Sequence, residues 1–156
     1  MSRGRVELAV RVRAPARAVW DAVTDWDAQG EWMTATQVRA VDGDGRGVGG
    51  RIEAFTGLGR LGFLDTMVVT EWRPPTWCAV RHTGAVVRGT GGFGIEELED
   101  EPGVCRLVWN EDLELPAGVL GAFAWRLLRP AVGLGVGRSL GRLARSVERA
   151  AASGGA

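Results

Sequence analysis

The sequence contains no lysine, no tyrosine and only one histidine, His82. Without lysine, the chain cannot form a Schiff base with a carbonyl substrate. With a single histidine it cannot build a multi-histidine metal site, and a Ser-His-Asp triad would have to use His82. The composition therefore leaves few routes to catalysis.

Cysteine is also scarce. Cys78 and Cys105 are too few for a disulfide framework or a four-thiolate zinc site. Each lies in an apolar run, so we expect both to be buried free thiols.

No segment predicts a targeting signal or a membrane span. The N-terminal residues are charged and lack the apolar core of a signal peptide. The longest weakly charged stretch, residues 117–137, contains Arg126, Arg129 and Pro130, which argues against a plain transmembrane helix. We expect a cytoplasmic protein.

The remaining composition is that of an ordinary globular domain. The 156 residues are 46% hydrophobic and 24% charged, so we expect one domain over residues 1–156. The 19 basic residues, all arginine, balance 19 acidic ones, so no net charge would recruit nucleic acid. The 24 glycines are clustered, which predicts turns and bulges in a strongly bent sheet.

The predicted elements run as one strand, two short helices, about six strands and one long helix. Residues 6–13 alternate apolar with polar side chains, as in a strand with one buried face. Pro15 begins a helix that contains Trp20, and a second short helix runs through Trp32 and Met33. Strands of period two follow at residues 37–41, 51–55, 66–72, 77–82, 86–98 and 105–115.

The C-terminal part returns to a helical period. We expect a helix over residues 119–150 that is interrupted or kinked at Pro130. One face carries Arg138, Arg142, Arg145 and Arg149, and residues 119–156 contain six arginines and one glutamate. We interpret this face as solvated; contact with an anionic membrane or a partner chain is the alternative.

This order predicts an α+β fold in which a curved antiparallel sheet of six or seven strands wraps around a long C-terminal helix. Such a sheet cannot close fully on a helix that crosses it. A space between them is expected, lined by inward strand residues and the helix stripe.

Three segments support a family resemblance: residues 14–26 (APARAVWDAVTDW), 69–75 (VTEWRPP) and 109–116 (WNEDLELP). Together with the terminal helix they resemble START-like (SRPBCC, helix-grip) proteins, in particular the polyketide cyclase/dehydrase-like branch. The resemblance implies a deep cavity for lipids, polyketides, hormones or other apolar molecules. Members are enzymes, carriers or sensors, so the fold does not select among these functions.

Strand parity turns His82 and Glu111 toward this cavity. His82 is two residues from Val80, and Glu111 is two residues from Trp109. Such a pair could polarise a ligand carbonyl or move a proton during aldol-type cyclisation or dehydration. Alternatively, each lies near the end of its strand, where a polar side chain meets water at little cost.

The other candidate ligand contacts come from several elements. Arg88 is a candidate for an anionic ligand group, although its parity is opposite to that of Phe93 unless a bulge intervenes. The apolar, glycine-rich segment 57–65 is expected to be a mobile loop that closes over a ligand, or else part of the core. The remaining candidates are Trp32, Met33, Phe63, Met67, Val80, Phe93, Trp109, Phe123 and Leu127.

No metal or cofactor is expected. The acidic group around the two short helices is better explained by the helix dipole than by a calcium loop. Its members are Asp21, Asp25, Asp27 and Glu31.

Three functions remain open. The favoured one is a carrier or sensor that binds a small hydrophobic ligand, lipid-, polyketide- or isoprenoid-like. The second is a polyketide cyclase, aromatase or dehydratase that uses His82 and Glu111. The third is contact with a membrane or partner chain through the arginine-rich helix, the chain being a monomer or homodimer. An enzyme needs at least two polar groups within ~3 Å of one ligand position, whereas a carrier does not.

Overall fold

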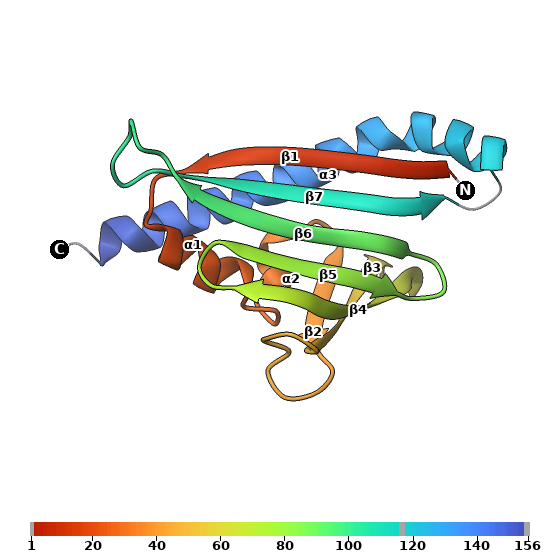
Figure 1. Cartoon of the computed structure of the whole chain (residues 1–156), viewed down its shortest axis with the longest axis horizontal. Coiled ribbons are helices and arrows are strands. Elements are labelled where there is room, and N and C mark those ends of the chain that lie inside the picture. Colours follow the sequence, from red (N-terminus) through yellow and green to blue (C-terminus); the bar gives the residue numbers. More distant parts are fainter. Residues whose placement is uncertain (1, 116–117, 155–156) are drawn as a thin grey trace.

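Seven antiparallel strands form one sheet in the order β1-β7-β6-β5-β4-β3-β2 (Figure 1). The computed structural model describes residues 2–115 and 118–154. The strands are β1 (Ser2–Val12), β2 (Thr36–Ala40), β3 (Arg51–Leu58), β4 (Leu61–Arg73), β5 (Trp77–Thr83), β6 (Arg88–Glu97) and β7 (Cys105–Leu115). The helices are α1 (Ala16–Val23), α2 (Gln29–Trp32) and α3 (Gly118–Ser153). The predicted α+β helix-grip fold is confirmed.

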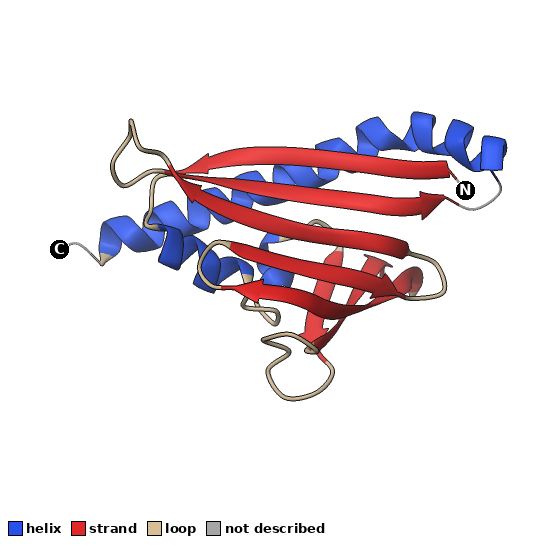
Figure 2. Cartoon of the chain, in the orientation of Figure 1, coloured by secondary structure: helices blue, strands red, loops and turns tan. Residues whose placement is uncertain are grey.

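All three helices lie on one side of the sheet, and α3 crosses it (Figure 2). The first strand pairs with the last along its whole length, from Ser2 opposite Leu115 to Val12 opposite Cys105. Because α3 directly follows β7, this pairing brings the helix beside β1. The two ends of the chain are therefore joined into one structural unit.

The space between sheet and helices is filled by side chains where α1 meets the second half of α3. Leu140 and Leu143 of α3 are buried there together with Val19 of α1 and Leu107 of β7. Full burial of each such side chain contributes ~1.5–3 kcal/mol to folding. The core thus fixes the second half of α3 and leaves its first half less covered.

Helix α3 is continuous through Pro130, so the predicted interruption is wrong. Proline removes one backbone hydrogen bond, here to the carbonyl of Arg126, and its ring disturbs the preceding turn. Both residues are exposed, so water can bind the carbonyl that has lost its partner.

Segment 57–65 is also not a loop. It forms the ends of β3 and β4, which meet at the two-residue turn Gly59-Arg60. A Cβ atom at Gly57 would lie 2.2 Å from the carbonyl oxygen of Leu61, so glycine permits the strands to approach here. The glycines that suggested a loop instead extend the hairpin.

Both cysteines are free and buried, as predicted. Burial raises the pKa of the Cys78 thiol to about 12 and, with the nearby Glu97 charge, raises the pKa of the Cys105 thiol. Neither thiol is activated as a nucleophile, because the thiolate is the reactive form.

Candidate functional site

A hollow of about 450 Å³ lies between the sheet, α2 and the middle of α3. From α3 it is lined by residues between Val132 and Leu140, and most of its wall is apolar. Three larger hollows, about 470, 830 and 990 Å³, occur elsewhere, but arginine and glutamate side chains form much of their walls. The hollow beside α2 is therefore the candidate site for an apolar ligand.

The structure places most of the residues singled out in the sequence on the wall of this hollow. Short helix α2 and the residue after it contribute two, and strands β4 to β7 contribute the rest. They are Trp32, Met33, Phe63, Met67, Val80, His82, Phe93, Trp109 and Glu111.

Three of the residues expected to contact a ligand lie away from this hollow. Arg88 is exposed at the start of β6 and does not line the hollow, in keeping with its opposite parity to Phe93. Phe123 and Leu127 are 64% and 66% exposed. They belong to the first half of α3, whereas the hollow meets this helix only from Val132 onward. Apolar residues recur at helical spacing along all of α3, so this pattern cannot show where the sheet stops covering the helix.

His82 on β5 contacts two carboxylates from different strands. Its Nδ1 lies 2.7 Å from Oδ2 of Asp65 on β4, and its Nε2 lies 3.0 Å from Oε2 of Glu111 on β7. The other oxygen of Glu111, Oε1, accepts a hydrogen bond from Nε1 of Trp109 at 3.0 Å. Hydrogen bonds therefore connect Asp65, His82, Glu111 and Trp109 in that order. We call the three ionisable residues the Asp65–His82–Glu111 cluster.

The contact between His82 and Glu111 depends on glycines in the strand between them. Strand β6 separates β5 from β7, and it places Gly89 opposite His82 and Gly91 opposite Glu111. Two strand spacings are about 9.6 Å, too far for side chains to meet over a bulky neighbour. A Cβ atom at Gly91 would lie 2.3 Å from Oε2 of Glu111. The absent side chain is what lets Glu111 reach across.

The cluster is buried and charged. Side-chain exposure is 5% for His82, 11% for Asp65 and 18% for Glu111. Burial alone would lower the pKa of His82, but hydrogen bonds and charges from Asp65 and Glu111 outweigh it and raise the pKa to about 9. At neutral pH the imidazolium donates both N–H groups, one to each carboxylate. The cluster then carries a net charge of −1, and Glu111 is its most exposed member.

Asp65 is the member that sequence reasoning missed as a site residue. It lies two residues before Met67 on β4, on the same face of the sheet, so strand parity would have found it. However, Asp65 ends the apolar, glycine-rich segment 57–65, whose sequence pattern indicates a loop or part of the core and not a strand. Its Oδ1 is buried and has no hydrogen-bond partner among the described residues.

Hydroxyl groups of the wall are hydrogen-bonded, whereas the indole N–H groups of Trp26 and Trp32 are buried without a partner among the described residues. Hydroxyls of Thr36 and Thr56 are 3.0 Å apart, and Ser139 on α3 donates to the carbonyl of Gly135 at 2.9 Å. Among the described residues, the Asp65–His82–Glu111 cluster supplies the only ionisable side chains of this wall. Within residues 2–115 and 118–154, no group of His, Cys, Asp and Glu could hold a metal ion.

Comparisons with known proteins agree with this architecture. A family model described as "Polyketide cyclase / dehydrase and lipid transport" matches residues 3–148. No curated protein sequence matches the chain.

Solved structures share the fold at low identity. The Zhui aromatase/cyclase from Streptomyces sp. R1128 is 20% identical, with a TM-score of 0.75 and 95% of each chain covered. TTHA0849 from Thermus thermophilus is 16% identical, with a TM-score of 0.76 over 94% of this chain and 98% of that one. The di-domain ARO/CYC StfQ of the steffimycin pathway is 12% identical, with a TM-score of 0.75 over 96% of this chain and 52% of StfQ.

Proposed function

The chain belongs to the polyketide cyclase/dehydrase and lipid transport family, and we propose that it binds an apolar, carbonyl-bearing small molecule and transfers protons on it. The observation that carries this proposal is the Asp65–His82–Glu111 cluster in the wall of an otherwise apolar hollow. Burying three ionisable groups costs free energy, and a pocket that only holds an apolar ligand does not require them. Two polar groups converging on one ligand position are the feature that distinguishes an enzyme from a carrier.

Glu111 is the group that would act on the ligand. It is the most exposed member of the cluster, and its Oε2 lies 3.0 Å from Nε2 of His82. On the other side of the imidazole ring, Oδ2 of Asp65 accepts a hydrogen bond from Nδ1 of His82. Glu111 is therefore the general base, and His82 and Asp65 orient and stabilise it.

The reaction class is enolisation followed by aldol-type ring closure. Glu111 takes a proton from the carbon next to a ligand carbonyl, and the C–H electron pair becomes part of an enolate. Once Glu111 is protonated, its hydrogen bond with the Nε2–H of His82 weakens. This N–H group can then donate a hydrogen bond to the enolate oxygen. The enolate carbon attacks a second carbonyl of the same ligand, and Glu111 returns its proton to the new alkoxide.

The wall suits a flat, apolar ligand. The rings of Phe93 and Trp109 are stacked with centroids 6.0 Å apart and an interplanar angle of 20°. Trp32 meets Trp109 edge-on from α2. Aromatic faces of this kind pack well against planar conjugated or aromatic ligands. A volume of about 450 Å³ lies within the usual range for small-molecule sites.

Deuterium exchange into a simple ketone tests the proton transfer without knowledge of the natural substrate. We would incubate 2-acetylnaphthalene with the protein in D₂O and follow loss of the methyl signal by NMR. The wild-type protein should accelerate the exchange, and Glu111→Gln should reduce the acceleration by about 100-fold, a typical loss for a general base. Binding of the probe is measured separately by quenching of tryptophan fluorescence.

Glu114→Gln is the matched control, because Glu114 lies on the same strand but with the opposite parity and outside the hollow. It should leave both exchange and binding unchanged. Exchange at the buffer rate with wild-type protein that binds the probe would overturn the catalytic proposal.

That outcome would favour the second candidate, a carrier or sensor without chemistry. One observation supports it: no arginine from the described residues lines the hollow, and its hydroxyls are already paired. His82 would therefore be the only positively charged donor of this wall, among the described residues, that could stabilise a developing oxyanion.

A further inference from the structure

One exposed stripe runs along the whole outward face of α3. Its residues recur at spacings of four and three, so they share one side of the helix. The first half is apolar and includes Leu120, Leu127 and Leu134, which are 75%, 66% and 55% exposed. The second half carries four arginines, Arg138, Arg142, Arg145 and Arg149. The stripe therefore changes from apolar to cationic halfway along the helix.

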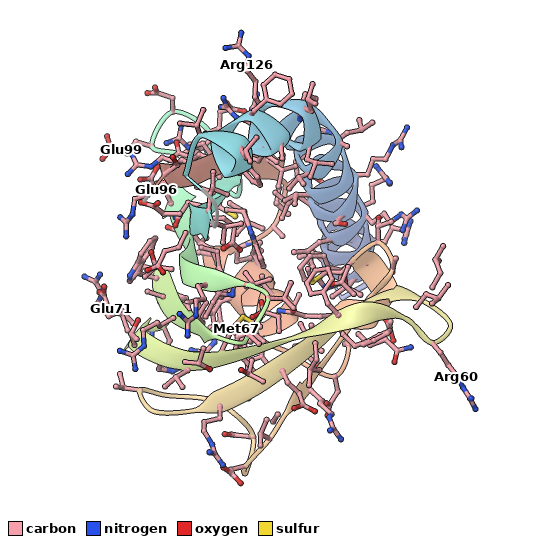
Figure 3. All side chains as sticks on the ribbon, turned by 90° about the vertical axis from the view of Figure 1, so that its right-hand side faces the viewer. Arg60, Met67, Glu71, Glu96, Glu99 and Arg126 are labelled. Atoms are coloured by element: carbon pink, nitrogen blue, oxygen red, sulfur yellow. The ribbon has the colours of Figure 1, made fainter. Side chains whose placement is uncertain are left out.

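A second exposed apolar surface lies across the same end of the molecule. The β3–β4 hairpin presents Leu58 and Leu61 at 79% and 83% exposure, on either side of its turn. Figure 3 looks onto this end, with the first turns of α3 at the top and the hairpin, marked by Arg60, at the right. Phe63 of the hairpin and Val132 of α3 both line the hollow. Each apolar surface therefore adjoins a residue of the hollow's wall.

The charges of α3 itself are almost all positive. Residues 115–147 contain no Asp or Glu, although the whole chain is neutral. Glu148, the one acidic residue of α3, accepts a hydrogen bond from the backbone N–H of Arg13. Arg60 stands at the hairpin turn, and Arg126 points away from the body at the start of α3 (Figure 3).

We propose that the first half of α3 and the β3–β4 hairpin dock this protein on an anionic phospholipid membrane, with the hollow opening toward the lipid. The leucines and Phe123 enter the boundary between headgroups and acyl chains, and the arginines bind lipid phosphates. An apolar ligand can then pass between bilayer and hollow without crossing water.

The protein would lie on the membrane rather than span it. An 18-residue window of α3 reaches a mean hydropathy of 1.3, with none of it buried, so by length and composition the helix could cross a bilayer. However, Leu140, Leu143 and Val147 hold its second half in the protein core. Only the first half is free to enter lipid.

A second copy of this chain fits the surface less well. A twofold interface places the same patch on both sides, so the stripe arginines of one copy would need acidic partners in the other copy's patch. Residues 115–147 offer no carboxylate to neutralise them. The hairpin and the helix also project separately, and a fluid bilayer accommodates this shape more readily than a rigid partner.

Flotation with lipid vesicles tests the proposal. Wild-type protein should bind phosphatidylcholine vesicles that contain about one third phosphatidylglycerol at least about tenfold more tightly than pure phosphatidylcholine vesicles, and high salt should weaken the difference. The double variant Phe123→Asp/Leu127→Asp should lose at least about tenfold in affinity. Replacing the four stripe arginines with glutamine should abolish the preference for anionic lipid.

The control is Val48→Asp combined with Arg46→Gln, in the loop between β2 and β3. This loop projects at the bottom of Figure 1, away from the start of α3, so vesicle binding should not change. Absence of vesicle binding, or binding that the double variant retains, would overturn the proposal. A wild-type dimer that the double variant dissociates, without vesicle binding, would assign the surface to a second copy. Fluorescence binding of 2-acetylnaphthalene in solution reports the site itself and should be unaffected by the surface variants.

Discussion

His82 is the residue on which the site's electrostatics depend. Its two ring nitrogens face carboxylates from strands on opposite sides of β5, so its protonation state controls both contacts. The folded protein binds the histidine proton more tightly than the unfolded chain does, since the pKa rises from 6.5 to about 9. Folding and protonation of His82 are therefore linked.

This linkage predicts a loss of stability at mildly alkaline pH. The contribution of His82, on the order of 3 kcal/mol, is complete below pH 6.5, declines as the pH rises toward about 9 and is absent above it. Urea unfolding from pH 6 to about 9 should show this decline in the wild-type protein but not in His82→Gln. Parallel pH profiles for the two proteins would contradict the prediction. The buried thiols do not interfere, because their ordinary pKa of 9.0 lies at the upper limit of the range.

At the scale of the element, strand β6 controls the site because it has a glycine, which lacks a side chain, opposite Glu111. Gly91 makes room for Glu111, whose oxygen occupies the volume that a side chain would need. We predict that Gly91→Ala separates Glu111 from His82, lowers the pKa of His82 and destabilises the fold by about 1–3 kcal/mol through overpacking. His82 is the only histidine, so one imidazole proton signal in an NMR titration reports the pKa directly.

Gly94→Ala is the control on the same strand. Its Cβ atom would meet the ring of Trp77 at 3.3 Å, far from the cluster. The pKa of His82 should stay at its wild-type value in this variant. An unchanged pKa in Gly91→Ala as well would show that the glycine is not what permits the contact.

The elements also show what sequence patterns can and cannot predict. Alternation identifies the inward face of β5 and β7, and His82 and Glu111 do lie at the hollow. The contact with Asp65 was missed, because glycines on both sides of Gly59-Arg60 resemble a loop in sequence, whereas in the fold they let two strands pair closely. Likewise, Phe123 and Leu127 continue the apolar period of α3, but the period carries no information on how far the sheet extends.

At the scale of the whole molecule, the net charge is zero, but positive and negative side chains are concentrated in different places. The 19 arginines balance 19 acidic residues, yet α3 carries six arginines and one glutamate. The hollow has the opposite sign, because its only ionisable lining among the described residues is a cluster with net charge −1. A ligand therefore meets positive charge outside the hollow and negative charge inside it.

This separation predicts selection by ligand charge. We would compare 2-naphthalenemethanol with 2-naphthoate, which share a ring system and differ in the charge of the substituent. At neutral pH the alcohol should bind at least about tenfold more tightly, because a carboxylate near Glu111 adds like-charge repulsion in a poorly hydrated site. Glu111→Gln removes one negative charge and makes the cluster neutral, so it should reduce the difference, while Glu114→Gln should preserve it. Tighter binding of the naphthoate to the wild-type protein would mean that the surface arginines, and not the cluster, govern which ligands this molecule accepts.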